Sequence, residues 1–393
     1  MKIPLLDLKK QYQTLKPAIL KAIENIVESG HFIMGPDIEA FEKEVAGYLG
    51  VKYALGVTSG TDALYMALKS YEIGHGDKVL TTPFTFFATA SAICNAGAEP
   101  VFADILEDTF NIDPEKVEDV LKRDIHKKIK AMMPVHLYGQ AAEMGALQSL
   151  ARKYNVRIIE DAAQSIGTTF QGKMTGTFGG YGCFSLFPTK NLGAMGDAGF
   201  LTTQDEVAYQ KAKLIRVHGG AKQYHHDIIG SNFRIDTMQA AILRVMLPHL
   251  PTWISARQGL AQKYNEAFEE MTPLVTAPKT SQNSNHTYHQ YTIRVQNGLR
   301  DSLKEHLTQK NIASAIYYPI PCHLQKALSN LGYQPGNFPV TEKASQEVLS
   351  LPVYPVLEAA EQQYVIDSIK EWASLQTHRT MPLSRDIGQS PEA

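Results

Sequence analysis

Short strand-like runs alternate with helical segments through the first half of the chain. Seven runs of this kind are recognisable: Tyr53–Val57, Lys78–Thr82, Pro100–Asp104, Ala131–His136, Val156–Glu160, Tyr181–Phe187 and Phe200–Thr203. Strands that alternate with helices predict a mostly parallel sheet with helices packed on its faces. We therefore expect an α/β fold built on a seven-stranded, mostly parallel sheet.

In a sheet of this kind, ligands bind at the carboxyl ends of the strands. The polar residues at those ends are Ser59, Thr85, His136, Asp161, Gln164 and Ser185. Asp161 ends a run that should be buried, and a buried carboxylate is costly unless a positive charge accompanies it. Either a salt bridge to an arginine or the ring nitrogen of a pyridinium cofactor could supply that charge.

Lys190 lies in a stretch of small, apolar and turn-forming residues, Tyr181 to Gly199. An ammonium group in near-apolar surroundings loses part of its preference for the charged form, so its amine becomes available as a nucleophile. The glycines that follow would let the backbone approach a bulky ligand closely. The same stretch also fits a glycine-rich loop that carries an ordinary surface lysine.

The segment after the first strand carries a helix-capping signature, Ser59 followed by Asp62. The free amides of Gly60 and Thr61 should therefore point out of a helix N-terminus. Such amides can cradle a phosphate, although a plain capped helix has the same signature. One of the aromatic residues after the second strand, Phe84 to Phe87, could stack on a flat ring or belong to the core.

The length of 393 residues allows one large domain and a smaller one. We place a large cofactor-binding domain at residues 1–255 and a small α+β domain at 256–377, with a polar stretch at 272–285 near the boundary. The elements expected in the small domain are a strand at 288–295, a helix at 300–311, a strand at 313–318 and a helix at 360–375. Residues 378–393 show no periodicity and are expected to form a disordered tail.

Composition excludes several classes of function. A net charge of −2 with 20% charged residues offers no polyelectrolyte surface, so we expect no nucleic-acid partner. The three cysteines form no CxxC motif, which fits a reducing compartment. No window approaches about 18 uncharged apolar residues, so we expect a cytoplasmic protein without a membrane partner. We expect no metal either, because His225, His226 and Asp227 lack a further ligand at suitable spacing.

Seven motifs, in order, resemble the DegT/DnrJ/EryC1/StrS sugar aminotransferases, a branch of the fold type I pyridoxal phosphate (PLP) enzymes. They are SGTDAL at 59–64, PFTFFATA at 83–90, PVHLYGQ at 134–140, EDAAQS at 160–165, FSLFPTKNLGAMGDAG at 184–199, GSNFRID at 230–236 and YYPIP at 317–321. Each motif is weak alone, but their order is specific. The resemblance implies a fold type I architecture, a cofactor that alternates between PLP and pyridoxamine phosphate, and a homodimer with shared active sites.

The resemblance also implies roles for individual residues. In that family, the lysine corresponding to Lys190 forms the Schiff base with the cofactor, and the aspartate corresponding to Asp161 pairs with the pyridine nitrogen; both are the implied catalytic residues. The other implied cofactor contacts are Ser59, Gly60, Thr61, Ser185 and Asn232 around the phosphate, the last from the neighbouring subunit, and Phe86 and Gln164 on the two faces of the ring.

The implied reaction moves an amino group from L-glutamate to a nucleotide-linked keto sugar, for amino-sugar or cell-surface polysaccharide biosynthesis. The motifs PVHLYGQ, YHQYTIRV and YYPIP are most similar to those of enzymes that aminate C3, and we expect UDP-linked 2-acetamido-3-keto-glucuronic acid as the substrate. The candidates for binding its carboxylate are His218, Arg234, Tyr317 and Tyr318. Tyr317 departs from the histidine expected in the most similar uronic-acid enzymes.

Three alternatives remain open within the enzymes: a dTDP-linked 3-keto-6-deoxyhexose, a 4-keto sugar, and a small keto acid or amino-cyclitol. The loop 216–234, with its HG and YHH elements, favours a sugar over a small keto acid. A PLP-binding regulator without catalytic activity is a different class of protein. Retention of Lys190, Asp161 and Ser185 together argues against it.

Overall fold

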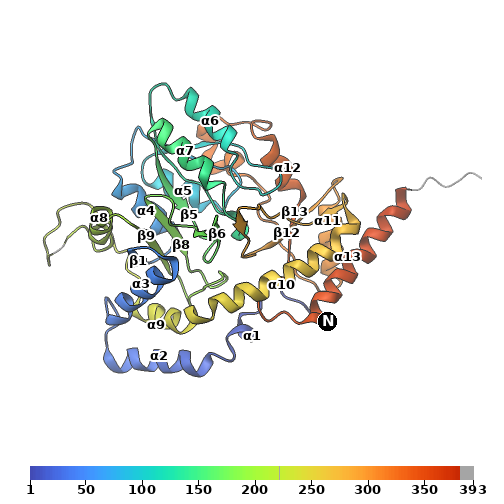
Figure 1. Cartoon of the computed structure of the whole chain (residues 1–393), viewed down its shortest axis with the longest axis horizontal. Coiled ribbons are helices and arrows are strands. Elements are labelled where there is room, and N and C mark those ends of the chain that lie inside the picture. Colours follow the sequence, from blue (N-terminus) through green and yellow to red (C-terminus); the bar gives the residue numbers. More distant parts are fainter. Residues whose placement is uncertain (221, 381–393) are drawn as a thin grey trace, which may run out of the picture.

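The computed structural model describes residues 1–220 and 222–380. Its central sheet has seven strands in the order β1-β9-β8-β5-β4-β2-β3 (Figure 1). Their bounds are Tyr53–Val57 (β1), Lys78–Thr81 (β2), Glu99–Phe102 (β3), Ile129–Met132 (β4), Arg157–Asp161 (β5), Tyr181–Ser185 (β8) and Gly199–Thr203 (β9). All seven predicted strands are present, although β4 lies earlier than expected and leaves His136 in the loop that follows.

Most of the sheet is parallel. The pairs β8·β5, β5·β4, β4·β2 and β2·β3 are parallel, whereas β9 is antiparallel to both β1 and β8. Because β9 reverses between them, β1 and β8 point the same way. The carboxyl ends of β1, β8 and β5 therefore lie at one edge of the sheet, and β9 begins there with Gly199. The expected α/β fold with a mostly parallel sheet is confirmed.

Helices cover both faces of this sheet. Those of the first 250 residues are Leu8–Tyr12 (α1), Lys16–Ser29 (α2), Pro36–Leu49 (α3), Gly60–Ser70 (α4), Ala88–Asn95 (α5), Pro114–Arg123 (α6), Met144–Tyr154 (α7), Glu206–Arg216 (α8) and Thr237–Met246 (α9). Neighbouring residues of a strand face opposite sides, so Cys183 joins the core beneath α4 and α8 while Phe184 joins the core beneath α3 and α9. Both layers are needed to bury a parallel sheet.

A second, three-stranded sheet in the order β10-β12-β13 lies in the C-terminal part of the chain. Its strands are Val275–Thr276 (β10), Tyr291–Val295 (β12) and Val348–Leu351 (β13), and the helices Arg300–Gln309 (α11), Pro339–Glu347 (α12) and Ala359–Thr380 (α13) accompany them. The sheet is covered by α11 and α13 (Figure 1). Sequence analysis found β12, α11 and α13 but missed α12 and β13.

The strand predicted at 313–318 is wrong. Ala315 forms only an isolated bridge with Ser350, and β13 supplies the sheet's third strand instead. The segment is held by contacts with the larger part of the molecule: the Tyr138 hydroxyl donates a hydrogen bond to the Tyr317 carbonyl, and the Tyr318 ring packs edge-on against Phe84. Tertiary contacts thus outweigh the strand-like composition of this segment.

Several short elements escaped prediction because two or three residues carry no periodicity. A third sheet, in the order β11-β6-β7, consists of Thr169–Phe170 (β6), Lys173–Met174 (β7) and Ser284–Asn285 (β11). Short 3-10 helices occur at Leu137–Gly139, Leu247–His249, Glu269–Met271, Cys322–Leu324 and Lys326–Leu331. In the described part of the chain, no helix has both the length and the apolar character needed to cross a membrane.

One long helix, α10 (Leu250–Phe268), belongs to both hydrophobic cores (Figure 1). Trp253 and Ile254 pack with the large sheet, whereas Tyr264 and Phe268 pack with the small one. Ile3 also packs in the small core, although the predicted limits assign it to the large domain. The limits 1–255 and 256–377 stay a prediction. Helix α13 continues to Thr380, past the predicted start of the tail at 378, and the rest of that tail lies outside the described residues.

Candidate active site

The N-terminus of α4 meets the end of β8 at very close range. A Cβ atom added to Gly60 would lie 2.7 Å from Cβ of Ser185, and one added to Gly199 would lie 2.7 Å from the backbone nitrogen of Gly60. Only glycines allow this approach. The first intrahelical hydrogen bond runs from the Ala63 amide to the Ser59 carbonyl, so the amides of Gly60 and Thr61 have no intrahelical acceptor. These two amides and the Ser185 hydroxyl can therefore bind an anion together.

Ser59 caps this helix with its side chain. Its oxygen accepts a hydrogen bond from the Asp62 amide at 3.1 Å, and its hydroxyl donates to the Asp62 carboxylate at 2.7 Å. Thr58 donates to the same carboxylate at 2.6 Å. The predicted capping signature is therefore confirmed. With its hydroxyl engaged on both sides, Ser59 contributes to an anion site by fixing the helix end.

Asp161 lies at the carboxyl end of β5, only 5% exposed. Its carboxylate accepts hydrogen bonds from the Thr89 hydroxyl at 2.8 Å and from the Ala163 amide at 3.2 Å. Burial raises the pKa of Asp161, and these hydrogen bonds and the charge of Lys190 oppose that rise. The carboxylate is thus fixed in position and still favours a nearby cation.

Lys190 is partly buried in the loop between β8 and β9. Burial lowers its pKa to about 8, against the opposing charge of Asp161. This agrees with the expectation that apolar surroundings free the amine. His289 is 8% exposed, and burial lowers its pKa. The charge of Lys190 lowers this pKa further, which indicates that the two side chains lie near each other. Lys190, Asp161 and His289 therefore form one electrostatically coupled group.

Aromatic and amide side chains border this group. The side chain of Gln164 accepts a hydrogen bond from the Tyr138 amide at 2.7 Å and donates one to the Tyr318 hydroxyl at 3.0 Å. Burial raises the pKa of Tyr318, and the charge of Asp161 also raises it. Tyr318 therefore lies in the same region as Asp161. The ring of Phe86 is 60% exposed and its centroid lies 6.2 Å from that of Tyr318. An exposed ring beside a polar cluster can stack on a flat ligand.

Other predicted residues lie apart from this cluster. His218 and Asn232 are exposed, and their segments pair at Val217 and Asn232 beyond α8. Arg234 pairs through its backbone with Val57, and its Nε is buried without a hydrogen-bond partner. Among the described residues, no hydrogen bond or ring contact joins these three to Lys190 or Asp161. The segment that carries Asn232 and Arg234 meets the chain just before α4, where the Thr58 amide donates to the Phe233 carbonyl.

Sequence reasoning missed two residues of the cluster, Thr89 and His289. Both lie inside motifs that were noticed, PFTFFATA and YHQYTIRV. Thr89, the second residue of α5, follows Thr85 by four positions and shares a hydrogen bond of 2.9 Å with it, so this i, i+4 spacing was the available signal. His289 comes from the C-terminal part of the chain and had no such signal. In the described residues no group of three or more His, Cys, Asp or Glu side chains could hold a metal ion.

The residues of this cluster fit pyridoxal phosphate, the cofactor implied by the sequence. The close approach of Gly60, Ser185 and Gly199 leaves amides and a hydroxyl for a phosphate. Asp161 offers a buried carboxylate for a protonated ring nitrogen, and Lys190 offers an amine with a lowered pKa for an aldehyde. The phosphate, the ring nitrogen and the aldehyde of the cofactor thus each have a chemically matched partner.

Comparison with known proteins gives a consistent result. Residues 13–370 match the DegT/DnrJ/EryC1/StrS aminotransferase family. A Geobacillus stearothermophilus protein named "Pleiotropic regulatory protein" is 45% identical over 95% of this chain and 99% of its own length. An Acidithiobacillus ferrooxidans UDP-N-acetyl-3-dehydro-alpha-D-glucosamine 3-aminotransferase is 42% identical over 90% of this chain and 94% of its own.

Solved structures share the fold. DesV of S. venezuelae, determined in complex with a ketimine intermediate, superposes with a TM-score of 0.91 at 38% identity and covers 95% of this chain and 98% of its own. NtdA of Bacillus subtilis, which holds the cofactor PMP, gives a TM-score of 0.89 at 31% identity, over 95% of this chain and 85% of its own. Both likenesses span the large and the small sheet.

Proposed function

The chain belongs to the DegT/DnrJ/EryC1/StrS aminotransferase family, and from that premise we propose that it transfers the amino group of L-glutamate to C3 of UDP-linked 2-acetamido-3-keto-glucuronic acid. The protein is an aminotransferase that depends on pyridoxal phosphate, and its relatives include a nucleotide-sugar 3-aminotransferase. The observation that carries the proposal is the convergence of Lys190, Asp161 and the N-terminus of α4 at one edge of the sheet.

The cofactor, when bound, supplies an electron sink for the carbon from which a proton is removed. In our proposal the amides of Gly60 and Thr61 and the Ser185 hydroxyl bind its phosphate, and Phe86 and Gln164 hold its ring. Asp161 keeps a positive charge on the ring nitrogen, because its buried carboxylate is stabilised by a cation. Thr89 holds that carboxylate in place.

Lys190 would move the proton. Burial lowers the pKa of its amine to about 8, so near neutral pH a fraction of it is unprotonated and could take up the proton from the donor's Cα. The nearby imidazole of His289, whose pKa burial lowers, stays neutral and adds no competing charge. A general base of this kind works best when its pKa lies near the working pH.

A uronic acid is favoured by Arg234. The Nε of this arginine is buried without a hydrogen-bond partner, and its backbone pairs with Val57, two residues before Ser59. A carboxylate would satisfy the guanidinium with charge-assisted hydrogen bonds. Tyr317, Tyr318 and His218 remain proposed substrate contacts. The uncharged side chain of Tyr317 leaves Arg234 as the principal cation proposed for this carboxylate.

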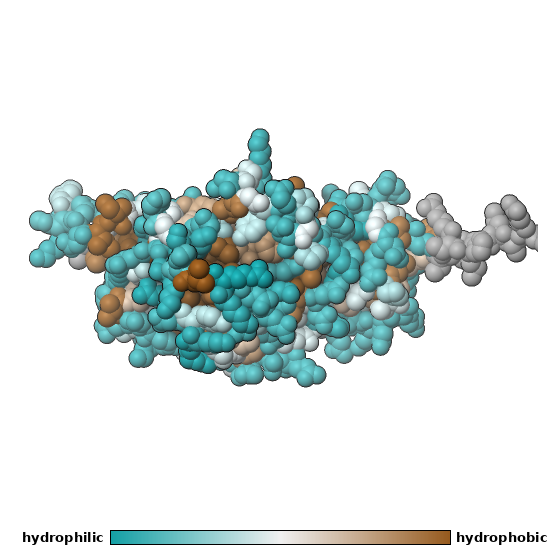
Figure 2. Space-filling view, turned by 90° about the horizontal axis from the view of Figure 1, so that it is seen from above, coloured by the Kyte–Doolittle hydropathy of each residue, from teal (hydrophilic) through white to brown (hydrophobic). Residues whose placement is uncertain are grey.

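We propose in addition that the active sites are shared within a homodimer, with Asn232 reaching the partner's phosphate site. Asn232 is exposed, as that role requires. The loop around it also exposes apolar side chains, with Ile229 90% exposed. Figure 2 shows a group of hydrophobic residues near the end of the molecule that carries α8 in Figure 1. Exposed apolar groups of this kind are typical of interfaces.

A substrate panel tests the proposal. The purified protein, with L-glutamate, is given 3-keto and 4-keto forms of UDP-linked and dTDP-linked sugars, and the release of 2-oxoglutarate and the amino sugar is measured by mass spectrometry. We expect the UDP-linked 3-keto-uronic acid to have the highest kcat/KM. Arg234→Ala should lower that value about 10- to 100-fold but change the value for the uncharged 2-acetamido-3-keto-glucose analogue less than about threefold.

Arg152→Ala serves as the control, because Arg152 is exposed on α7 and, within residues 1–220 and 222–380, its side chain donates a hydrogen bond to Ser149 on the same helix. A better turnover of a dTDP-linked 3-keto-6-deoxyhexose that is insensitive to Arg234→Ala would refute the uronic-acid assignment. Turnover of 4-keto sugars alone would refute amination at C3. Absence of 2-oxoglutarate with every sugar would refute glutamate as the donor.

A further inference from the structure

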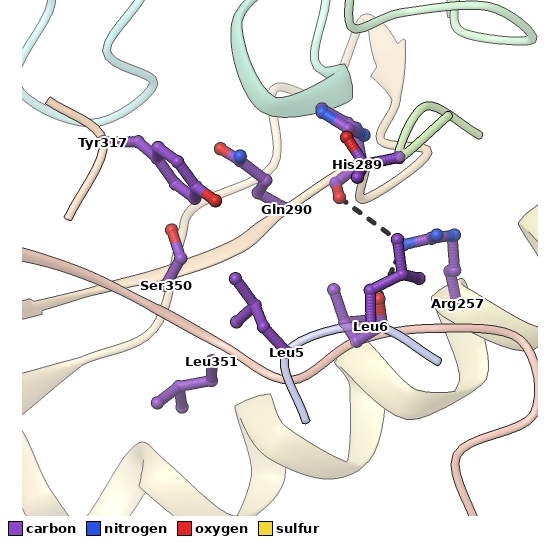
Figure 3. A pocket seen from close by; sticks show the side chains of 10 residues that line it. Leu5, Leu6, Arg257, His289, Gln290, Tyr317, Ser350 and Leu351 are labelled. Atoms are coloured by element: carbon purple, nitrogen blue, oxygen red, sulfur yellow. Dashed lines mark hydrogen bonds between the residues drawn. The ribbon is translucent and has the colours of Figure 1, made fainter. Parts of the chain in front are cut away.

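A small pocket adjoins the candidate active site on the side of the C-terminal sheet (Figure 3). Its volume is about 90 Å³, and Thr189, the residue before Lys190, lies on its wall. Arg257 on α10 and His289 and Gln290 just before β12 provide polar wall atoms. The N-terminal segment closes the opposite side with leucine side chains (Figure 3). The pocket thus lies where both cores and the Lys190 loop meet.

Three polar atoms of these wall residues are buried without a hydrogen-bond partner: Nε of Arg257, Nδ1 of His289 and Oε1 of Gln290. Arg257 is 2% exposed and His289 is 8% exposed. Buried polar groups in native proteins nearly always have a partner, so each exception requires one from outside the chain. Three such atoms around a single small pocket indicate a polar occupant. Arg257 Nε can donate to an acceptor, His289 Nδ1 can donate in one tautomer, and the Gln290 amide can rotate so that its nitrogen, rather than its oxygen, faces an acceptor.

The charge of the wall indicates an anion. Arg257 donates from Nη1 to three backbone carbonyls, of Tyr288, His289 and Val353, at 3.2, 3.4 and 2.7 Å, so its guanidinium is fixed in place. No carboxylate occurs among the residues that line the pocket. Burial lowers the pKa of Arg257 to about 10, which is the sign of a charge without compensation. A carboxylate would compensate it through charge-assisted hydrogen bonds.

The size of the pocket limits the occupant. A volume of about 90 Å³ accepts a carboxylate and the short carbon chain behind it, but no pyranose ring with its substituents. Thr189 on the pocket wall precedes Lys190 in the chain, and the charge of Lys190 contributes to the lowered pKa of His289 on the same wall, so the pocket and the amine are neighbours. A dicarboxylic amino acid has a distal carboxylate of this kind, whereas alanine has none.

We propose that this pocket binds the distal carboxylate of the amino donor, with Arg257 and Gln290 as its principal contacts, and so selects a dicarboxylic amino acid. The hydroxyls of Tyr317 and Ser350, which also line the pocket, provide further polar contacts. The inference rests on the proposed function, because a donor site has meaning only in an aminotransferase that uses a separate amino donor. In this proposal Arg257 and Gln290 determine the specificity for the amino donor.

Calorimetry with glutarate tests the pocket without turnover, because glutarate has two carboxylates and no amino group. We expect wild-type holoenzyme to bind glutarate, and both Arg257→Met and Gln290→Leu to weaken that binding about 10- to 100-fold. Arg300→Met is the matched control. Arg300 likewise donates to two backbone carbonyls, those of Ser345 and Val348, but lies outside the pocket, so its variant should bind glutarate normally.

Thermal unfolding of the variants shows whether weaker glutarate binding comes from loss of the pocket or from loss of the fold. Arg257 ties three carbonyls together, and if Arg257→Met does not fold, Gln290→Leu decides the question, because the Gln290 side-chain oxygen has no partner to lose. A folded Gln290→Leu protein that binds glutarate as tightly as wild type would overturn the proposal. Failure of wild type to bind glutarate would overturn it as well and leave water as the occupant.

The source of the carboxylate is settled by comparing two ligands. Glutarate and UDP-glucuronate should compete, because the donor and the sugar react in turn at the same lysine, but Gln290→Leu should weaken only the binding of glutarate. Equal weakening of UDP-glucuronate binding would assign the pocket to the sugar and overturn the donor site. Half-reaction spectra supply a second readout: Gln290→Leu should lose glutamate reactivity about tenfold and keep its slower alanine reactivity. A protein that binds glutarate but aminates no keto sugar would instead refute the proposed function.

Discussion

At the scale of single residues, the site depends on how burial changes protonation. Burial lowers the pKa of Lys190 to about 8 and raises that of Asp161, so each group is pushed toward its neutral form and each is drawn back by the charge of the other. The two groups are therefore coupled. A change at Asp161 must alter the titration of Lys190, and this coupling can be measured in the cofactor-free protein.

The rate at which cofactor-free protein captures PLP covalently should rise with pH and reach half its maximum near pH 8, because the neutral amine is the reactive form. Asp161→Asn should move that midpoint lower, since it removes the charge that favours the protonated amine. Stopped-flow absorbance measures both rates, and Lys52→Ala, an exposed lysine, is the control. A midpoint near the ordinary value of 10.5 would contradict the burial argument.

The same shift affects stability. The pKa of Lys190 is lower in the folded protein than in the unfolded chain, so between about pH 8 and 10.5 the unfolded chain binds more protons. The stability of the cofactor-free protein, relative to Lys190→Met, should therefore rise with pH over that window. Below pH 8 the destabilisation caused by burying the charged lysine should be at its maximum. Urea unfolding at several pH values measures this difference between the two proteins.

At the scale of single elements, α4 is the part that the site depends on most. Gly60→Ala places a Cβ atom 2.7 Å from that of Ser185 and should weaken PLP binding about tenfold or more, because the helix end must move away from β8. Gly47→Ala in α3 is the matched control: nothing lies within 4 Å of the added atom, so it should leave binding unchanged and stabilise the fold by about 0.5–1 kcal/mol. Equal cofactor affinity in both variants would contradict a phosphate site at the N-terminus of α4.

A buried ion pair fastens two other elements to the sheet. Arg216 at the end of α8 lies 2.5 Å from Glu42 on α3, and both bond the backbone of Gly56 in β1. Arg216→Met should destabilise the fold by about 3–5 kcal/mol at pH 7, because the remaining carboxylate is buried without its partner. Chemical denaturation should show this loss, and adding Glu42→Gln should restore much of it.

The loss should depend on pH. Burial raises the pKa of Glu42 above its usual 4.5 even with Arg216 present, and removal of the arginine raises it further. The folded Arg216→Met protein then holds a proton that the unfolded chain releases, so its stability should fall as pH rises above about 4.5. Lys78→Met, which breaks the exposed pair with Glu99, should cost less than about 1 kcal/mol at any pH.

At the scale of the whole molecule, one chain does not bring all the predicted cofactor-binding residues together. Asn232 lies exposed and makes no described contact with the Lys190 cluster, which suits a residue that acts on a second copy of the chain. Mixing Lys190→Ala protein with Asn232→Ala protein should restore about a quarter of wild-type activity if subunits exchange freely, since half of the dimers are hybrids with one intact site. Glutamate-dependent release of 2-oxoglutarate measures the recovery. No recovery after exchange is proved by mass spectrometry would contradict a shared site.

Local patterns determined the large sheet and its chemistry. Seven strands alternate with helices, and the parallel pairing that this alternation favours brings Ser59, Asp161 and Ser185 to one edge. The capping signature at Ser59 was likewise local, since the hydrogen bond spans only three residues. The environment of Lys190 was predictable for the same reason, because the apolar residues around it are its neighbours in sequence.

Features that depend on contacts between distant parts of the chain were decided only by the tertiary structure. The segment 313–318 is no strand, because it is held by Tyr138 and Phe84 from the large part of the molecule. His289 and Arg257, from distant parts of the C-terminal half, reach the pocket beside Lys190 only because α10 joins both cores. A sequence pattern reports neighbours along the chain, whereas burial, pairing and unsatisfied hydrogen bonds depend on neighbours in space.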